Sequence, residues 1–159
     1  SNLFFSAVAY RQRVKNPIEF GLGIAAALEA AVPTAQLGKD LADLGQNLYH
    51  PPTVEGWPCG RYWINSATIV GRNNLAKKLL ASKGPYGGKL DPAVVAEKHG
   101  HTEPEEACRF LLNLLLQCDV GEGVAETLLE TATLTEGSTA ERLRRFVHTA
   151  VTLPEYQLA

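Results

Sequence analysis

The chain has 159 residues, of which 45% are hydrophobic and 20% are charged, and its formal net charge is -2. This composition can build one sizeable hydrophobic core and predicts a single domain over residues 1–159. Proteins that bind nucleic acids carry clustered positive charge, so we expect no nucleic-acid partner. No apolar run reaches the roughly 18 residues of a membrane-spanning helix, so we expect no membrane span.

The beginning of the sequence is unusual. The chain contains no methionine and opens on Ser1-Asn2-Leu3. We therefore expect a fragment of a longer protein, with its first two residues left by a tag. A fragment can carry half of a functional site, so the missing N-terminal region is itself an expected partner.

Hydrophobic periodicity predicts helices and no sheet, because no alternating pattern of useful length occurs. The expected fold class is all-α, a compact bundle of about seven helices with a long loop rich in proline, glycine and tryptophan. In chain order, helices are expected over residues 3–13, 17–31, 34–48, 65–83, 92–99, 103–118, 120–134 and 139–152. The third carries a core-facing apolar stripe, which consists of Leu37, Leu41, Leu44 and Leu48.

Helix-start signals support several of these helices. Asn16-Pro17 followed by Glu19 predicts a capping box, in which the first side chain accepts a hydrogen bond from the third helical amide. A capping residue with an acid three positions later recurs at Thr102 with Glu105, at Asp119 with Glu122, and at Ser138 with Glu141. Asp91-Pro92 opens the short helix over residues 92–99.

Two helices carry features that bear on packing. The small residues of the helix over 17–31 do not favour an isolated helix, so they predict the close approach of a neighbouring element. In the helix that follows Asn65, the predicted core face contains Gly71, Leu75 and Leu79. Arg72 is assigned to another face.

Residues 48–65, which we call the aromatic loop, hold the densest set of uncommon side chains, including both tryptophans. Its candidate binding residues are Glu55, Trp57, Arg61, Tyr62, Trp63 and Asn65. In one interpretation the aromatic rings form a platform for a sugar or a partner's aliphatic surface, with Arg61 and Glu55 fixing its orientation. In the other, the rings fasten a loop without regular structure onto the bundle.

Other constellations are weaker. His99 and His101 stand among acids, but they lack the H-E-x-x-H spacing and a third ligand, so we predict a solvated linker and no metal site. Cys59 and Ser66 lack the motifs that activate a nucleophile. We therefore assign no catalytic residue and expect no cofactor.

Three segments carry a resemblance to a known family. They are Asn-Pro-Ile-Glu-Phe at 16–20, the run from Leu44 to Ala67 with its Pro-Pro, Gly-Trp-Pro and Trp-x-Asn-Ser-Ala pattern, and Leu-Pro-Glu-Tyr-Gln at 153–157. Together they resemble the C-terminal part of the DUF1800 family, bacterial proteins of unknown function. The resemblance runs from Lys15 to the end, although residues 83–102 carry no matching motif. Cys59 departs from the small residue expected at its position.

The resemblance implies a context and no mechanism. Family members are longer chains that often look exported and are frequently found beside a sulfatase-like family. It therefore implies a periplasmic or cell-envelope location, with an envelope protein or a glycan as a partner. It transfers no catalytic residue.

Three hypotheses of function follow. In the first, the chain is a non-catalytic packing or interaction module, and the aromatic loop is its contact surface. In the second, Glu55, Arg61 and Asn65 belong to a hydrolase-like active site for a cell-envelope substrate. In the third, the aromatic rings bind a glycan. An enzyme needs its polar groups to converge in a pocket, whereas a packing role needs them paired within the fold.

Overall fold

The computed structural model describes residues 6, 8–117, 119–134 and 136–159. Within these ranges the regular structure is helical, with no strand beyond isolated bridges, which confirms the all-α class. The helices are α1 (Pro17–Ala27), α2 (Thr34–Asp43), the 3-10 helix η1 (Gly60–Trp63), α3 (Ser66–Leu80), α4 (Pro92–Lys98), α5 (Pro104–Leu116), α6 (Glu122–Leu134), α7 (Thr139–Thr152) and α8 (Pro154–Gln157).

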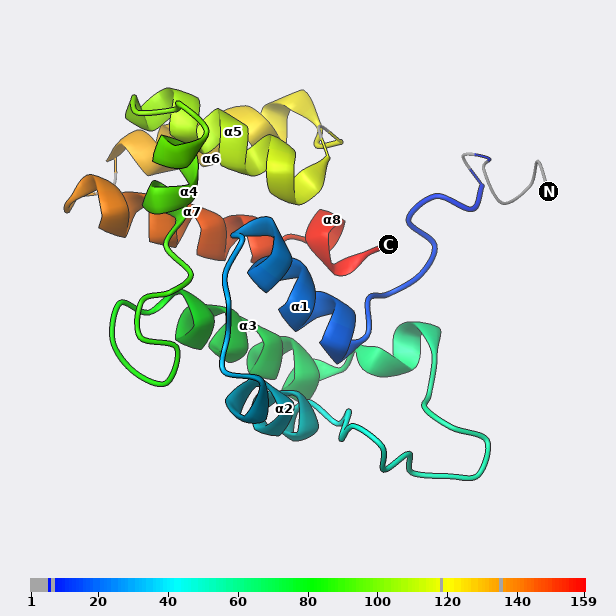
Figure 1. The fold of residues 1–159 in the computed structure, drawn as a ribbon. Helices are drawn as coiled ribbons and strands as arrows, with labels where there is room; N and C mark the ends of the chain where they lie inside the picture. Colours follow the sequence, from blue (N-terminus) through cyan, green and yellow to red (C-terminus); the bar gives the residue numbers. More distant parts are fainter. Residues whose placement is uncertain (1–5, 7, 118, 135) are drawn as a thin grey trace.

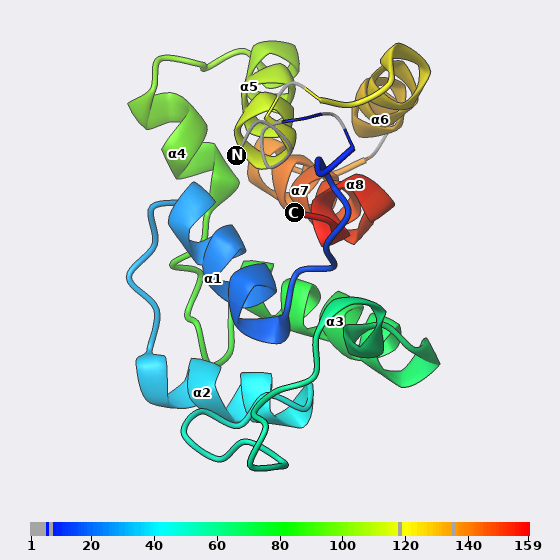
Figure 2. The ribbon, with the colours of Figure 1, turned by 90° about the vertical axis from the view of Figure 1, so that its right-hand side faces the viewer.

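Helix α7 is the centre of the bundle. It packs against α3, α4, α5, α6 and α8, while α1 contacts α2, α3 and α5. In Figures 1 and 2, α5 and α6 lie at the top and α2 at the bottom, with α7, α1 and α3 between them. Apolar side chains recur along α7 at helical spacing and are buried, at Leu143, Phe146, Val147, Ala150 and Val151. This continuous stripe lets one helix bind several neighbours.

Local capping signals place most of the helix starts. Asn16 with Glu19 and Ser138 with Glu141 form the predicted capping boxes. Asp91 accepts a hydrogen bond from the Ala93 amide at 3.1 Å, as expected at the start of α4.

Two predicted caps are wrong. Helix α5 begins at Pro104 and is preceded by Glu103, which makes no side-chain capping bond, so Thr102 lies outside the helix. Proline suits a first helical position because it has no amide hydrogen to satisfy. Helix α6 begins at Glu122, and Asp119 instead pairs with Arg11 at 3.5 Å.

The helix predicted over residues 3–13 is wrong where the structure describes it. Residues 8–11 form turns, residues 12 and 13 belong to no helix, and residues 1–5 and 7 lie outside the described residues. The backbone of residues 13–15 pairs with that of 157–159: the Lys15 amide donates to the Gln157 carbonyl at 2.8 Å, and the Ala159 amide donates to the Arg13 carbonyl at 2.7 Å. A distant segment therefore satisfies the groups that a helix would have paired locally.

Helix ends are earlier than predicted. Helix α2 ends at Asp43 because Gly45 adopts a φ of +92°, a left-handed conformation that stops the helix. Leu48 is consequently exposed, while the other three leucines of the predicted stripe are buried. Helix α1 ends four residues, and α3 three residues, before the predicted limit.

The close approach predicted for α1 occurs at Gly21, where a Cβ atom would lie 3.2 Å from the Leu41 side chain of α2.

A buried carboxylate joins α2 to α3 and to the loop before α4. Asp40 accepts hydrogen bonds from Lys78 Nζ at 2.6 Å and from the Tyr86 hydroxyl at 2.6 Å, and Gln36 Nε2 donates to it at 3.0 Å. Burial opposes ionisation, but these donors hold the pKa of Asp40 below its ordinary value. The carboxylate is therefore a charged anchor between three segments.

We expect Asp40→Asn to lower the free energy of unfolding by about 2 kcal/mol at neutral pH, because an amide cannot accept all three hydrogen bonds. A pKa depressed by folding contributes stability above the unfolded value, and this stability is lost as the pH falls through the folded value. Urea unfolding from neutral pH down to about pH 2 should therefore show a flatter acid limb for the variant than for the wild type.

Asp43→Asn is the matched control, because Asp43 ends the same helix and is exposed. Equal losses of stability in the two variants, or an unchanged acid limb in Asp40→Asn, would contradict the assigned role of Asp40.

Candidate functional site

The aromatic loop leaves the end of α2, projects from the helical body and returns through η1 to α3 (Figures 1 and 2). Its tip is closed by a turn in which the Gly56 amide donates to the Thr53 carbonyl at 3.1 Å. Tyr49, Val54 and Tyr62 are among its most exposed apolar side chains. The loop therefore presents apolar surface to solvent.

The two tryptophans occupy different environments. Trp63 is only 5% exposed, whereas Trp57 is half-buried, and their ring centroids lie 6.5 Å apart. The Trp63 carbonyl accepts a hydrogen bond from the Thr68 hydroxyl at 3.0 Å, which joins the end of η1 to the first turn of α3. Trp63 thus anchors the loop, and no open face of it remains for a ligand.

The polar candidates of the loop do not share one pocket. Asn65 caps α3: its Oδ1 accepts from the Thr68 amide at 2.9 Å. Glu55 is exposed and makes no hydrogen bond or ion pair with any described residue. Arg61 is also exposed and unpaired among the described residues, but it lines a groove that Glu55 and Asn65 do not line.

This groove, which we call the α3–α8 groove, has a volume of about 710 Å³. It lies between α3, the end of α7, α8 and the segment before α1. Its apolar walls are formed by Val14, Ile64, Ile69, Val70, Pro154 and Leu158. Ile69 and Val70 are more than half exposed, although both are branched apolar residues near the start of α3.

Arg72 lines the groove and is only 2% exposed. Its Nη1 donates to Gln157 Oε1 at 2.9 Å, its Nη2 donates to the Lys15 carbonyl at 2.6 Å, and its guanidinium lies 5.2 Å from the centre of the Phe20 ring. The Nε atom is buried and has no hydrogen-bond partner in the described part of the chain. Burial lowers the pKa of Arg72 to about 10, so the group stays charged at neutral pH.

Several other cations lie near Arg72, in the segment before α1. The Lys15 ammonium lies 4.0 Å from the centre of the Tyr156 ring, and burial together with the charges of Arg11, Arg13 and Arg72 lowers its pKa. Arg13 pairs with Glu19, but neither Lys15 nor Arg72 forms an ion pair with a described carboxylate. This region therefore has an excess of cations over acids.

Arg72 is not on the predicted core face of this helix, which runs through Gly71, Leu75 and Leu79, so its burial is a difference from the prediction. The buried residues of α3 are Arg72, Leu75, Ala76, Leu79 and Leu80, an i, i+3, i+4, i+7, i+8 pattern in which arginine holds the first position. Extending the apolar pattern backwards from Leu80 would have found it. Its oxygen partners come from residues 15 and 157, which no local pattern connects.

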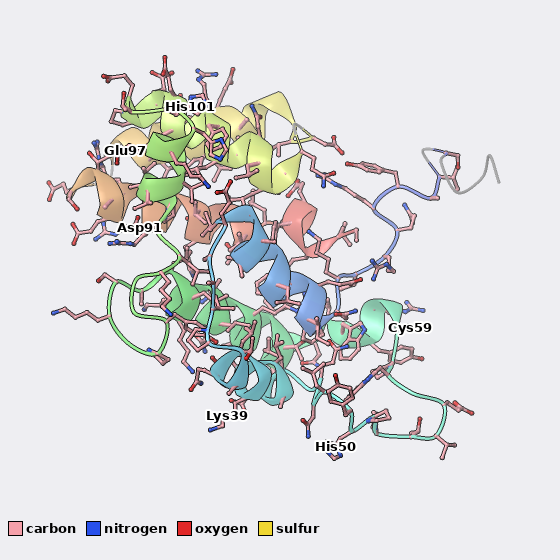
Figure 3. The ribbon with its side chains drawn as sticks, viewed as in Figure 1. Lys39, His50, Cys59, Asp91, Glu97 and His101 are labelled. Carbon is pink, nitrogen blue, oxygen red and sulfur yellow. The ribbon has the colours of Figure 1, made fainter. Side chains whose placement is uncertain are left out.

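The other candidates of the sequence are placed apart. His50 and Cys59 lie at separate points of the aromatic loop (Figure 3). His99 Nε2 lies 2.8 Å from Glu29 Oε1, and His101 stacks on Phe110 with ring centroids 4.5 Å apart. In the part of the chain that the structure describes, no three metal-ligating side chains gather into a site. No described helix has the length and hydrophobicity needed to cross a membrane.

One family model matches the chain. Its description is "Protein of unknown function (DUF1800)", and the match covers residues 1–158. The likeness is therefore wider than the stretch from Lys15 onward that the sequence motifs indicate. No curated protein and no solved structure matches the chain.

Substitutions of two neighbouring aromatic residues test which part of the loop anchors it and which part is merely exposed. We expect Trp63→Ala to lower the free energy of unfolding by about 3 kcal/mol, because it removes a buried ring. Tyr62→Ala should change it by less than about 0.5 kcal/mol, because Tyr62 is 77% exposed. Chemical denaturation followed by circular dichroism measures both, and similar losses in the two variants would contradict the assignment of Trp63 as the anchor.

Proposed function

The chain belongs to the DUF1800 family of proteins of unknown function, and we propose that it is a non-catalytic interaction module that binds an apolar segment of a partner protein in the α3–α8 groove. The observation that carries this proposal is the groove itself, with Ile69 and Val70 left exposed on its wall. A volume of about 710 Å³ lies within the usual range of ligand-binding pockets. Concave apolar surface that stays open to water is typical of binding sites.

The rim of the groove favours a protein as the ligand. Arg61 lines the groove, and the next residue, Tyr62, is a highly exposed aromatic side chain. Tyrosine and arginine are the residue types that most often anchor protein interfaces, because each combines a large contact area with directed hydrogen bonds. The aromatic loop therefore extends the contact surface beyond the groove.

The geometry gives less support to the other hypotheses. A hydrolase-like site needs Glu55, Arg61 and Asn65 around one substrate, but only Arg61 lines the groove and Asn65 is engaged in capping α3. A glycan platform needs several open aromatic faces, but of Trp57, Tyr62 and Trp63 only Tyr62 is exposed, because Trp63 is buried and Trp57 is half-buried. These two observations argue against the alternatives and favour the interaction role.

The cell-envelope location implied by the family resemblance is part of this proposal. The partner is then an envelope protein that offers an apolar segment. A segment from the N-terminal region of a longer form of this protein is a different occupant, which the sequences selected in the following experiment would reveal.

Two exposed helical valines provide a matched test of the groove. Val70 lies on the groove wall and is 58% exposed, whereas Val94 lies on α4, outside the groove, and is 61% exposed. Short random peptides displayed on phage are selected on the wild-type chain, and their affinities are measured by fluorescence anisotropy. We expect Val70→Ser to weaken the selected apolar peptides by roughly fivefold to tenfold, because it removes apolar contact area.

Val94→Ser should leave these affinities unchanged. A selection that enriches no peptide, or peptides that bind the Val70→Ser variant as tightly as the wild type, would overturn the proposed function. Circular dichroism of both variants verifies that they remain folded.

A further inference from the structure

The α3–α8 groove has a charge pattern that goes beyond its apolar walls. It contains two arginines, Arg61 and Arg72, and no aspartate or glutamate is among the described residues that line it. The whole chain carries a formal net charge of -2, so the absence of acids here does not reflect a general shortage of them. The groove is a local cationic site on an acidic protein.

Arg72 is a buried cation with no carboxylate in direct contact, and Glu19, the acid that acts on it at longer range, is paired with Arg13. Its described hydrogen-bond acceptors are two neutral oxygens, those of Gln157 and Lys15. A guanidinium carries five N–H groups, and the one on Nε is buried without an acceptor among the described residues. Removing a charge and a donor from water is unfavourable unless an acceptor compensates. A carboxylate brought into the groove, which Arg72 lines, would supply the opposite charge.

Arg61 supplies the second cation from a different element. It belongs to η1, at the end of the aromatic loop, and it is exposed and unpaired among the described residues. An exposed arginine can reorient at little cost, whereas the guanidinium of Arg72 is held in place by its two hydrogen bonds. The groove thus combines one fixed and one adjustable cation with apolar walls.

We propose that the groove selects partner segments in which an acidic side chain stands among apolar residues, and that Arg61 and Arg72 bind its carboxylate. This inference rests on the proposed function and adds the chemistry of the ligand. Arginine and carboxylate form charge-assisted and often bidentate hydrogen bonds, which are stronger where water is excluded. The apolar walls bind the residues that flank the acid.

Arg72 also has a structural role, which has to be separated from recognition of the ligand. Arg72 already connects α3 to residues 15 and 157, so its loss could weaken binding through misfolding alone. Arg61 has no such contact with any described residue. Its replacement therefore tests recognition of the ligand without disturbing the fold.

Three phage libraries of short apolar peptides provide the test, differing only in a fixed central residue: glutamate, glutamine or lysine. Peptides are selected on the wild-type chain, and dissociation constants are measured by fluorescence anisotropy on matched Glu and Gln forms. We expect the Glu forms to bind about tenfold more tightly, with a preference that falls as salt is added. Arg61→Gln should reduce this preference severalfold, and Arg61→Glu should shift it toward lysine peptides.

The control variant is Arg109→Gln, which removes an exposed arginine of α5 that pairs with Glu105 outside the groove. It should retain the full preference for glutamate. Arg72→Lys keeps the charge but not the planar fork, and it should reduce the preference in protein that circular dichroism shows to be folded. If this variant does not fold, the Arg61 variants decide the question.

The outcomes separate the two proposals. Peptides that bind the groove equally well with Glu and Gln would overturn the carboxylate inference and leave the interaction module standing. A selection in which no library yields a binder would overturn both. Amidation of the peptide C-terminus should leave the affinity of the Glu forms unchanged, and a large loss of affinity would overturn the inference by showing that the terminal carboxylate is the group bound.

Discussion

The position of the groove depends on one guanidinium. Arg72 extends from α3 to the Lys15 carbonyl and to the side chain of Gln157, and it lies beside the ring of Phe20 in α1. A single side chain thereby connects the segment before α1, α1 itself, α3 and α8. The backbone pairing between residues 13–15 and 157–159 lies next to this connection. Three of these elements, the segment before α1, α3 and α8, also form walls of the groove, so the guanidinium that joins them holds those walls together.

A buried arginine is a costly connector in a helical bundle. A leucine at this position would pack without losing hydration, but it could not bond to two oxygens from segments 142 positions apart in the sequence. Carbonyl and amide oxygens and the face of Phe20 offset part of the cost of burying the charge. They do not neutralise it. The excess positive charge gives the groove its preference for an anion, so a structural connector and a recognition element reside in one residue.

The sequence predicts the helical class and most helix starts because those signals are local. Asn16 with Glu19 and Ser138 with Glu141 need only the spacing within one turn to form their capping boxes. The failures concern partners that are distant in the chain. The backbone of residues 13–15 pairs with residues near 157, and the helix expected there does not form. The partners of Arg72 belong to the same class, since its acceptors come from residues near both ends of the described chain.

The two interpretations of the aromatic loop apply to different residues of it. A 3-10 helix has three residues per turn, so in η1 positions 60 and 63 lie on one face while Arg61 and Tyr62 lie on others. Trp63 is buried and Asn65 caps α3, which fixes the end of the loop to the bundle. Arg61 and Tyr62 are exposed as a consequence of that anchoring. Composition alone cannot separate these roles, because the helical phase of η1 decides which aromatic side chain is buried and which is exposed.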